Sequence, residues 1–185
     1  MSLRHFLNLS KRMKAKSKVS VGEETTIQEV KEERMNTLVL GVGNPILTDD
    51  GIGIKIAQRL KEEKPDLEVI ETSEAAIAIL DLIVMAGCDK LIVIDSIKTG
   101  QGRPGELYKF ELEDLKPAND FSSSHGVDIA TVFELGRRAG YNMPEYISIY
   151  AVEVQDNTTF GEECTDKVKE KISFIAKQII EKEKL

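Results

Sequence analysis

The sequence predicts an α/β fold in which helices cover both faces of one mostly parallel sheet of about five strands. The first observation is that short apolar segments rich in β-branched residues alternate with longer segments whose apolar residues recur at helical spacing. Right-handed crossovers between successive parallel strands place such helices on both sides of a sheet. The second is size, because 185 residues with 41% hydrophobic content suit a single domain with one continuous core.

The first five expected elements follow one another as strand, helix, strand, helix and strand. Residues 37–41 (T-L-V-L-G) form a short apolar run that ends in glycine, which is typical of a strand buried on both faces. In the next segment Ile52, Ile56, Ala57 and Leu60 recur at helical spacing. We therefore expect a helix at 50–63, a strand at 67–72, a helix at 75–86 and a strand at 90–95.

The second half of the chain adds two strands and two helices. Residues 106–112 follow a turn-rich stretch and are expected to form an antiparallel edge strand. A helix at 126–139 and a strand at 146–153 come next. The final helix is expected over 162–182, since one apolar stripe runs along it, formed by Val168, Ile172, Ile175 and Ile179.

The start of the chain has a different composition. Before residue 36 there is no strand pattern and only a short helix is indicated, at 26–34, so we expect an extension over 1–35 and a single domain over 36–185. Residues 1–22 contain six Lys or Arg and no acidic residue, which leaves 23–185 with a formal charge of −13 against −7 for the whole chain. An acidic body argues against nucleic-acid binding, which needs a basic face.

Two further sequence features concern location and thiol chemistry. No apolar run approaches the roughly 20 residues that span a bilayer, and the N-terminus lacks a signal peptide's apolar stretch. We therefore expect a cytoplasmic protein without a membrane span. Cys88 and Cys164 lie far apart and outside any C-x-x-C pair, which predicts two free, buried thiols.

The candidate site follows from the predicted topology. Ligands of an open parallel sheet bind outside the carboxyl ends of its strands. The first strand leads into G-V-G-N-P-I-L-T-D-D-G-I-G, which begins like a glycine-rich phosphate loop. It lacks the third glycine of a dinucleotide fingerprint, where Ile46 stands, and the G-K-[ST] ending of a Walker loop. It ends instead in two carboxylates, Asp49 and Asp50, which disfavour a bound phosphate.

Three side chains are expected to meet at this edge: Asp50, Asp95 and His125. Asp95 ends an apolar strand (K-L-I-V-I-D), so its carboxylate should emerge in partial burial, and His125 precedes a predicted helix as the one histidine of the domain. Each also has a structural interpretation, because either acid can cap a helix or turn and a lone histidine commonly packs. Together they form an oxygen and nitrogen ligand set with open positions, suited to nickel, zinc, manganese or iron.

Two other site chemistries fit less well. A serine hydrolase would have to use Ser96 or Ser124, and no G-x-S-x-G elbow is present. A phospho-acceptor receiver domain places its acid pair directly after the first strand, whereas here the pair begins eight residues after Gly41. No lysine ends the strand at 146–153 either.

At these residues the sequence resembles the hydrogenase maturation protease family, whose members trim the C-terminal extension from the large subunit of nickel-iron hydrogenases. The resemblance runs from about Thr37 to the C-terminal helix and rests on three segments in order: G-V-G-N-P-I-L-T-D-D-G-I-G, L-I-V-I-D-S and S-S-H-G-V-D. It implies a three-layer α/β/α sandwich of the phosphorylase/hydrolase type. It also implies that Asp50, Asp95 and His125 are the metal-binding and catalytic residues of an aspartic-type endopeptidase.

The resemblance further implies the partner and the metal. The partner is the hydrogenase large-subunit precursor, and the metal is the nickel that this precursor already carries, although other divalent ions could substitute. We expect a monomer. Substrate contacts are expected from Asn44, Asp49, Ser73 and Glu74. One departure stands out, because many relatives have a glycine-rich turn where this chain reads E-T-S-E-A-A, which puts the identity of the substrate in doubt.

The sequence leaves the chemistry open at two points. A bound ion could polarise the scissile carbonyl or lower the pKa of a water toward 7. Alternatively, the ion positions the substrate and the carboxylates activate water. Two rival functions also remain: a non-catalytic nickel-binding or assembly module, and a related metal-dependent hydrolase with a substrate other than a hydrogenase.

Overall fold

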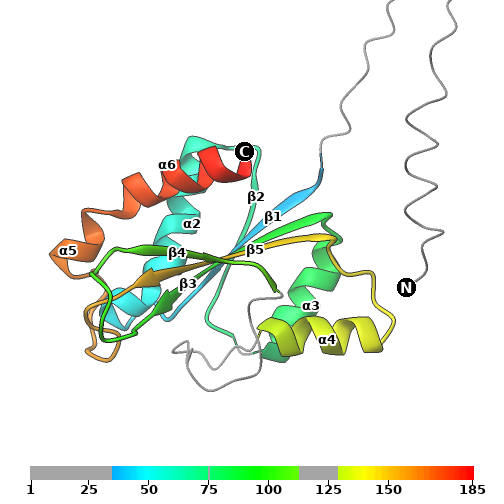
Figure 1. Ribbon diagram of the computed structural model, residues 1–185, viewed down its shortest axis with the longest axis horizontal. Coiled ribbons are helices and arrows are strands. Elements are labelled where there is room, and N and C mark those ends of the chain that lie inside the picture. Colours follow the sequence, from blue (N-terminus) through cyan, green and yellow to red (C-terminus); the bar gives the residue numbers. More distant parts are fainter. Residues whose placement is uncertain (1–34, 75, 113–128) are drawn as a thin grey trace, which may run out of the picture. The chain divides into compact units, whose positions relative to one another are not determined.

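The computed structural model describes residues 35–74, 76–112 and 129–185. All of them belong to one unit, Arg34–Leu185, of the two into which the chain divides. The described residues form a five-stranded sheet in the order β2-β1-β3-β5-β4 (Figure 1). The strands are β1 Thr37–Val42, β2 Glu68–Thr72, β3 Lys90–Ile97, β4 Leu107–Phe110 and β5 Tyr146–Glu153. The helices are the 3-10 turn η1 Thr48–Gly51, α2 Ile52–Glu63, α3 Ala76–Ala86, α4 Ile129–Arg138, α5 Asp166–Lys169 and α6 Ile172–Glu183.

The sheet is parallel except at one edge. β1 pairs in parallel with β2 and β3, and β3 pairs in parallel with β5. β4 pairs antiparallel with β5, which confirms the predicted antiparallel strand at the edge of the sheet. The register places Val42 beside Thr72 and Ile97 beside Glu153, so the carboxyl ends of the parallel strands share one edge.

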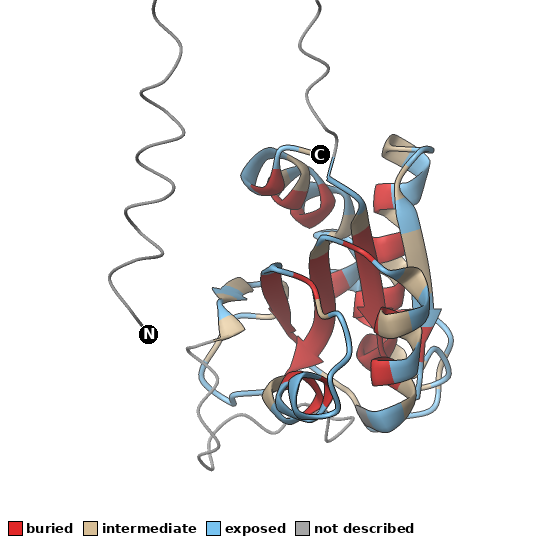
Figure 2. Ribbon diagram, turned by 90° about the vertical axis from the view of Figure 1, so that its right-hand side faces the viewer, coloured by how far each residue is buried: buried red, intermediate tan, exposed pale blue. Residues whose placement is uncertain are grey.

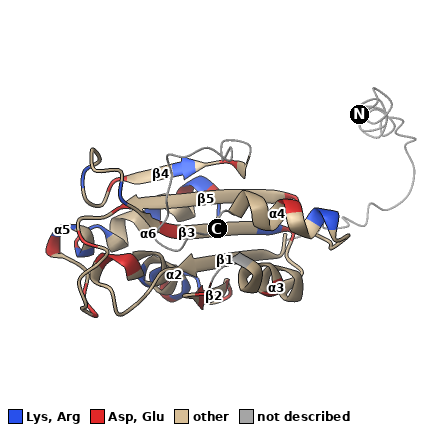
Figure 3. Ribbon diagram, turned by 90° about the horizontal axis from the view of Figure 1, so that it is seen from below, with Lys and Arg blue, Asp and Glu red and all other residues tan. Residues whose placement is uncertain are grey.

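Helices cover both faces of this sheet, and each face has its own core (Figure 2). On one face α2 and α6 pack together over Val39, Ile92 and Ile94, whose side chains are fully buried. On the other face α3 and α4 cover Leu91 and Val93, the alternate residues of β3. Charged residues lie mainly on the helices and loops and are few in the central strands (Figure 3). The predicted α/β fold is therefore confirmed.

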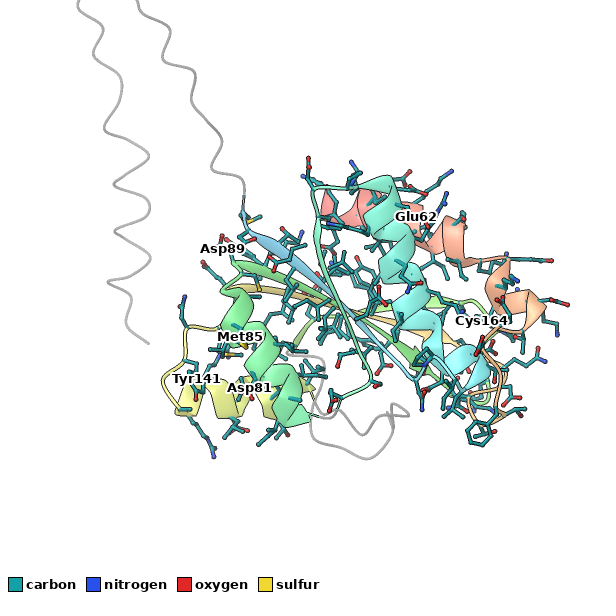
Figure 4. All side chains as sticks on the ribbon, turned by 180° about the vertical axis from the view of Figure 1, so that it is seen from behind. Glu62, Asp81, Met85, Asp89, Tyr141 and Cys164 are labelled. Atoms are coloured by element: carbon teal, nitrogen blue, oxygen red, sulfur yellow. The ribbon has the colours of Figure 1, made fainter. Side chains whose placement is uncertain are left out.

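The two cysteines are free and buried, as predicted. Burial raises the pKa of the Cys88 thiol and raises that of Cys164 to about 11. Cys164 precedes α5 (Figure 4), and its thiol lies 3.6 Å from the carbonyl oxygen of Thr48. Since the thiolate is the reactive form of cysteine, neither side chain is prepared to act as a nucleophile.

A buried polar network fixes the C-terminal helix to the sheet. The carboxylate of Glu183 accepts a hydrogen bond from the Tyr150 hydroxyl at 2.6 Å and pairs with Lys90 at 2.7 Å and Lys109 at 3.1 Å. Burial alone would raise the pKa of Glu183, but the hydrogen bonds from Lys90, Tyr150 and Lys109 outweigh it and lower the pKa to about 2. The end of α6 is thereby tied to β3, β4 and β5.

Two helix predictions are wrong in detail. The helix expected from Asp50 begins at Ile52, because residues 48–51 form the 3-10 turn η1, and neither η1 nor α2 has a side-chain cap. The single helix expected over 162–182 is two helices, α5 and α6, joined by a turn at 170–171. The first of these helices also starts later than expected, at Asp166. The residue before it, Thr165, donates hydrogen bonds from its backbone N–H and its hydroxyl to Asp49.

Some predictions fall on residues that the structure does not describe. They are residues 1–34 of the extension expected over 1–35, the short helix expected within it at 26–34, and residues 126–128 of the helix expected at 126–139. Across the described ranges, none of the helices is both long enough and apolar enough to cross a membrane. The cytoplasmic location stays a prediction.

Candidate functional site

The loop after β1 folds back over the carboxyl edge of the sheet, and a glycine allows it. Gly43 has φ +152°, and its N–H donates to the Thr72 carbonyl at the end of β2 at 3.1 Å. A Cβ at this position would lie 2.2 Å from the Asp50 carbonyl oxygen. Any other residue at position 43 would therefore push Asp50 away from the strand ends.

A second glycine lets the first turn of α2 rest directly on the strands. A Cβ on Gly53 would lie 2.2 Å from the Val42 carbonyl oxygen and 2.3 Å from that of Ile94. Both neighbours are backbone atoms of β1 and β3, so they cannot move aside as a flexible side chain could. This close approach fixes the position of Asp50 relative to β3.

Asp50 is fully buried at this edge. Its Oδ2 accepts a hydrogen bond from the Asn44 backbone N–H at 2.9 Å, within its own loop. Its Oδ1 accepts one from the Ser96 hydroxyl at 3.0 Å, which comes from β3. The carboxylate thus connects the loop after β1 to the neighbouring strand.

Asp95 lies on β3 and is only 9% exposed. The strand continues for two residues beyond it, so Asp95 is not the last residue of the strand, and it is more buried than the sequence predicts. Its Oδ1 accepts a hydrogen bond from the backbone N–H of Ser96 at 2.7 Å.

Ser96 therefore contacts both predicted acidic residues. Its hydroxyl donates to Asp50 and its N–H donates to Asp95, and the residue is 1% exposed. Successive side chains of a strand point to opposite faces, so Ser96 faces the α2 side while Asp95 faces the α3 and α4 side. Sequence reasoning considered Ser96 only as the nucleophile of a serine hydrolase and missed its hydrogen bond to Asp50. The sequence signal for this bridge is the position of Ser96 directly after Asp95 in L-I-V-I-D-S.

The third predicted ligand, His125, lies outside the described residues, as does Ser124. Among the residues that are described, no group of three or more His, Cys, Asp or Glu side chains could hold a metal ion. The structure brings Asp50 and Asp95 to one edge through Ser96, and their meeting with His125 stays a prediction. Carboxylate oxygens are ligands of divalent transition ions, so the two acids keep a chemistry suited to the predicted metal.

Asp49 has a different environment from its neighbour Asp50. It is fully buried, and its Oδ2 accepts hydrogen bonds from the backbone N–H groups of Gln155 at 3.0 Å and Asp156 at 2.9 Å. Its Oδ1 accepts one from the Thr165 N–H at 2.7 Å, and the Thr165 hydroxyl also contacts the carboxylate. This geometry gives Asp49 a structural role, because its carboxylate accepts hydrogen bonds within the fold. Its contact with substrate stays a prediction.

The other predicted substrate contacts lie at the same edge. Asn44 is half-buried, and its Oδ1 accepts a hydrogen bond from the Ile46 N–H at 3.2 Å. Ser73 and Glu74 are exposed after the end of β2, where the Glu74 N–H donates to the Thr72 hydroxyl at 3.0 Å. Their contact with substrate stays a prediction.

A cavity among the described residues lies away from this site. It measures about 700 Å³ and lies at the opposite, amino end of the sheet, where Asn36, Lys90 and Glu183 help to line it. In the part of the chain that the structure describes, the candidate site is an edge built from loops and strand ends.

Comparisons with known proteins show the family to which the chain belongs. A family model described as hydrogenase maturation protease matches residues 52–182. The chain is 31% identical over 121 residues to the Hydrogenase 2 maturation protease of Escherichia coli (strain K12), covering 64% of this chain and 73% of that protein.

Two solved structures are also similar. The hydrogenase maturating endopeptidase HybD from E. coli has a TM-score of 0.64 and 25% identity, covering 81% of this chain and 93% of that one. The [NiFe] hydrogenase maturation protease HybD from Thermococcus kodakarensis has a TM-score of 0.59 and 26% identity, covering 80% and 98%. These matches confirm the family that the sequence motifs resemble and identify the protein as a peptidase. The chain belongs to the hydrogenase maturation protease family.

Proposed function

We propose that this protein is an endopeptidase that removes the C-terminal extension of a nickel-iron hydrogenase large-subunit precursor after nickel insertion. The observation that carries the proposal is the bridge by which Ser96 joins Asp50 and Asp95 at the carboxyl edge of the sheet. Membership of the family supports the reaction class, and the names of the relatives support a hydrogenase as the substrate.

In this proposal Asp50, Asp95 and His125 bind the nickel that the precursor carries. Two carboxylates and one imidazole suit a divalent transition ion, and they leave positions open for the ligands that the substrate itself supplies. Ser96 holds one oxygen of each carboxylate through a neutral donor, which fixes both side chains without neutralising their charge. Recognition of the metal then positions the scissile bond beside the carboxylates, which act on the attacking water.

The burial of both acids is consistent with this role. A carboxylate that is shielded from solvent interacts more strongly with a cation than an exposed one does. Asp50 is held between a loop and a strand, and Asp95 lies within a strand, so neither needs to reorganise when the metal arrives. The precursor without nickel would meet two fixed negative charges and lose the attraction that the ion provides.

The test is to incubate the full-length protein with precursor that is either loaded with nickel or free of it. Mass spectrometry should detect release of the C-terminal tail from the loaded form alone. Equal cleavage of both forms would refute nickel recognition, and no cleavage of either would refute the proposed reaction.

Two variants sharpen this test. Asp95→Asn should abolish trimming of the loaded precursor, because it removes one of the two site charges. Asp81→Asn is the matched control, since Asp81 is an exposed acid on α3 outside the site (Figure 4). It should cleave at the wild-type rate. Equal rates for the two variants would contradict the assignment of Asp95.

A further inference from the structure

Two exposed apolar side chains lie side by side next to the proposed site, although their loops are far apart in the sequence. Ile46 follows β1 and is 51% exposed, and Phe160 follows β5 and is 80% exposed. Leu47 and Gly161 form a parallel β-bridge, and the Gly161 N–H donates to the Ile46 carbonyl at 3.0 Å. The bridge and this hydrogen bond make Ile46 and Phe160 backbone neighbours, and both side chains are exposed. Ile46 and Phe160 therefore form one apolar patch.

The loop that carries Phe160 is held firmly in place. Asp49 accepts hydrogen bonds from backbone N–H groups before and after it, at Gln155, Asp156 and Thr165. The Thr48 hydroxyl lies within hydrogen-bond distance of the Thr159 carbonyl, at 2.9 Å. On the other side the Lys55 ammonium donates to the Glu162 carbonyl at 2.7 Å. Most of these contacts are to main-chain atoms, so they fix the loop's path whatever its side chains are.

Holding the loop in this position costs free energy, which a loop without a binding role would not require. Thr48 is β-branched and yet has φ +23°, in the left-handed region that such residues avoid. The fully buried carboxylate of Asp49 makes its hydrogen bonds to this segment of the chain. Fixing the backbone around an aromatic side chain that is left in solvent adds nothing to the core, but it does prepare that side chain for binding.

The two loops that carry the patch are also connected to the site. Asp50 and Ile46 belong to the same loop, in which the Asp50 N–H donates to the Leu47 carbonyl at 2.7 Å. The loop of Phe160 leaves the carboxyl end of β5, next to the strand that carries Asp95. A polypeptide whose scissile bond lies at Asp50 and Asp95 would therefore pass close to Ile46 and Phe160.

We propose that Ile46 and Phe160 form a docking surface for the precursor, which places an apolar segment close to its scissile bond on this patch. The inference rests on the proposed function. The size of the patch favours a segment of substrate over a second copy of this chain. Two side chains with this exposure offer on the order of 300 Å², whereas a stable dimer buries about 800 Å² on each partner.

The test measures cleavage and binding separately. Ile46→Ala and Phe160→Ala are made singly and together in the full chain, and kcat and KM are determined with nickel-loaded precursor. The double variant should raise KM at least about tenfold, as truncation of a hot spot does, and change kcat less than about twofold. Its melting temperature should stay within about 2 °C of the wild type, because both side chains are exposed. Phe174→Ala is the control, an exposed Phe on α6 whose loss should change neither constant.

Equilibrium binding of the same precursor, measured by titration calorimetry, separates this inference from the proposed function. Weaker binding by the double variant supports the docking surface even if the wild type cleaves nothing, and the proposed function alone then fails. Unchanged affinity overturns the docking surface whether or not the precursor is cleaved. A wild-type dimer that becomes a monomer in the double variant, seen by analytical ultracentrifugation, would also overturn it, because a second copy would then be the occupant.

Discussion

Replacing Asp49 with asparagine distinguishes two neighbouring buried acids that the sequence cannot tell apart. Both oxygens of Asp49 accept backbone hydrogen bonds: Oδ2 from Gln155 and Asp156, and Oδ1 from Thr165. Asparagine has one carbonyl oxygen, so its NH₂ group must face at least one of these N–H donors in either orientation. At least one buried donor then loses its acceptor, and the remaining hydrogen bonds lose the help of the charge.

The expected cost follows from these contacts. Leaving a buried donor without a partner costs about 1–3 kcal/mol, and the charge-assisted bonds that weaken add to it. We therefore expect the free energy of unfolding to fall by about 2–4 kcal/mol. For a domain of this size that corresponds to a decrease in melting temperature of about 5–12 °C.

Asp50→Asn is the matched variant, because its two described hydrogen bonds can both survive. The new amide oxygen can accept from Asn44, and the NH₂ group can donate to the Ser96 hydroxyl. This variant should lose less than about 1 kcal/mol of stability while losing its cleavage activity, because the charge that holds the metal is gone.

The assay is urea denaturation followed by circular dichroism, which suits a chain without tryptophan. Cleavage of nickel-loaded precursor is measured in parallel. Equal stability of the two variants would refute the structural role assigned to Asp49. A fully stable Asp49→Asn protein that fails to cleave would show instead that Asp49 contacts the substrate, as the sequence predicts.

Three further predictions concern the bridge, the glycine contact and the buried ion pairs. Ser96→Ala should lower kcat and shift the pH dependence of cleavage, because the Asp50 carboxylate loses the hydroxyl that donates to it while the backbone N–H to Asp95 remains, and Ser96→Thr should restore part of the rate; an unchanged pH profile would contradict the bridge. Gly53→Ala should cost about 3 kcal/mol or more, since its Cβ would meet two carbonyl oxygens that cannot give way, and thermal unfolding measures this. The pKa of Glu183 is about 2 in the folded protein against 4.5, so its contribution of about 3 kcal/mol is complete above pH 4.5 and is lost as the pH falls toward 2. Glu183→Gln should remove that part of the acid sensitivity, and a wild-type slope between pH 4.5 and 2 in this variant would refute the assignment.

The strands and their order along the chain can be predicted because their signal is local. Residues 37–41 and 90–95 are continuous apolar runs, and the helices between them have a regular apolar spacing. Parallel pairing then brings the carboxyl ends to one edge, so a position near Asp50 and Asp95 can be inferred for a site. Topology alone thus places the two acids at the same edge, whereas their connection through Ser96 does not follow from it.

The roles of individual residues at the edge depend on distant partners, and the sequence does not reveal them. Asp49 and Asp50 are adjacent and identical, yet the partners of Asp49 lie more than 100 residues away at Gln155 and Thr165. The start of α5 cannot be placed from periodicity for the same reason, because Asp49 holds the residue before it. Phe160 carries no local signal at all, since a single exposed aromatic residue is common on protein surfaces.

The distance in sequence between Asp49 and its partners also sets the order in which the protein can become active during synthesis. β1, β2, α3 and β3 emerge from the ribosome before Gln155 and Thr165 exist, so the loop of Asp50 has nothing to fix its outer side. Completion of that loop must wait for the last part of the chain, and Glu183 attaches the final helix later still. Contacts between such distant residues form slowly. A nascent or truncated chain would therefore carry both acids without the loop that frames them, which delays proteolysis until the whole domain has been made.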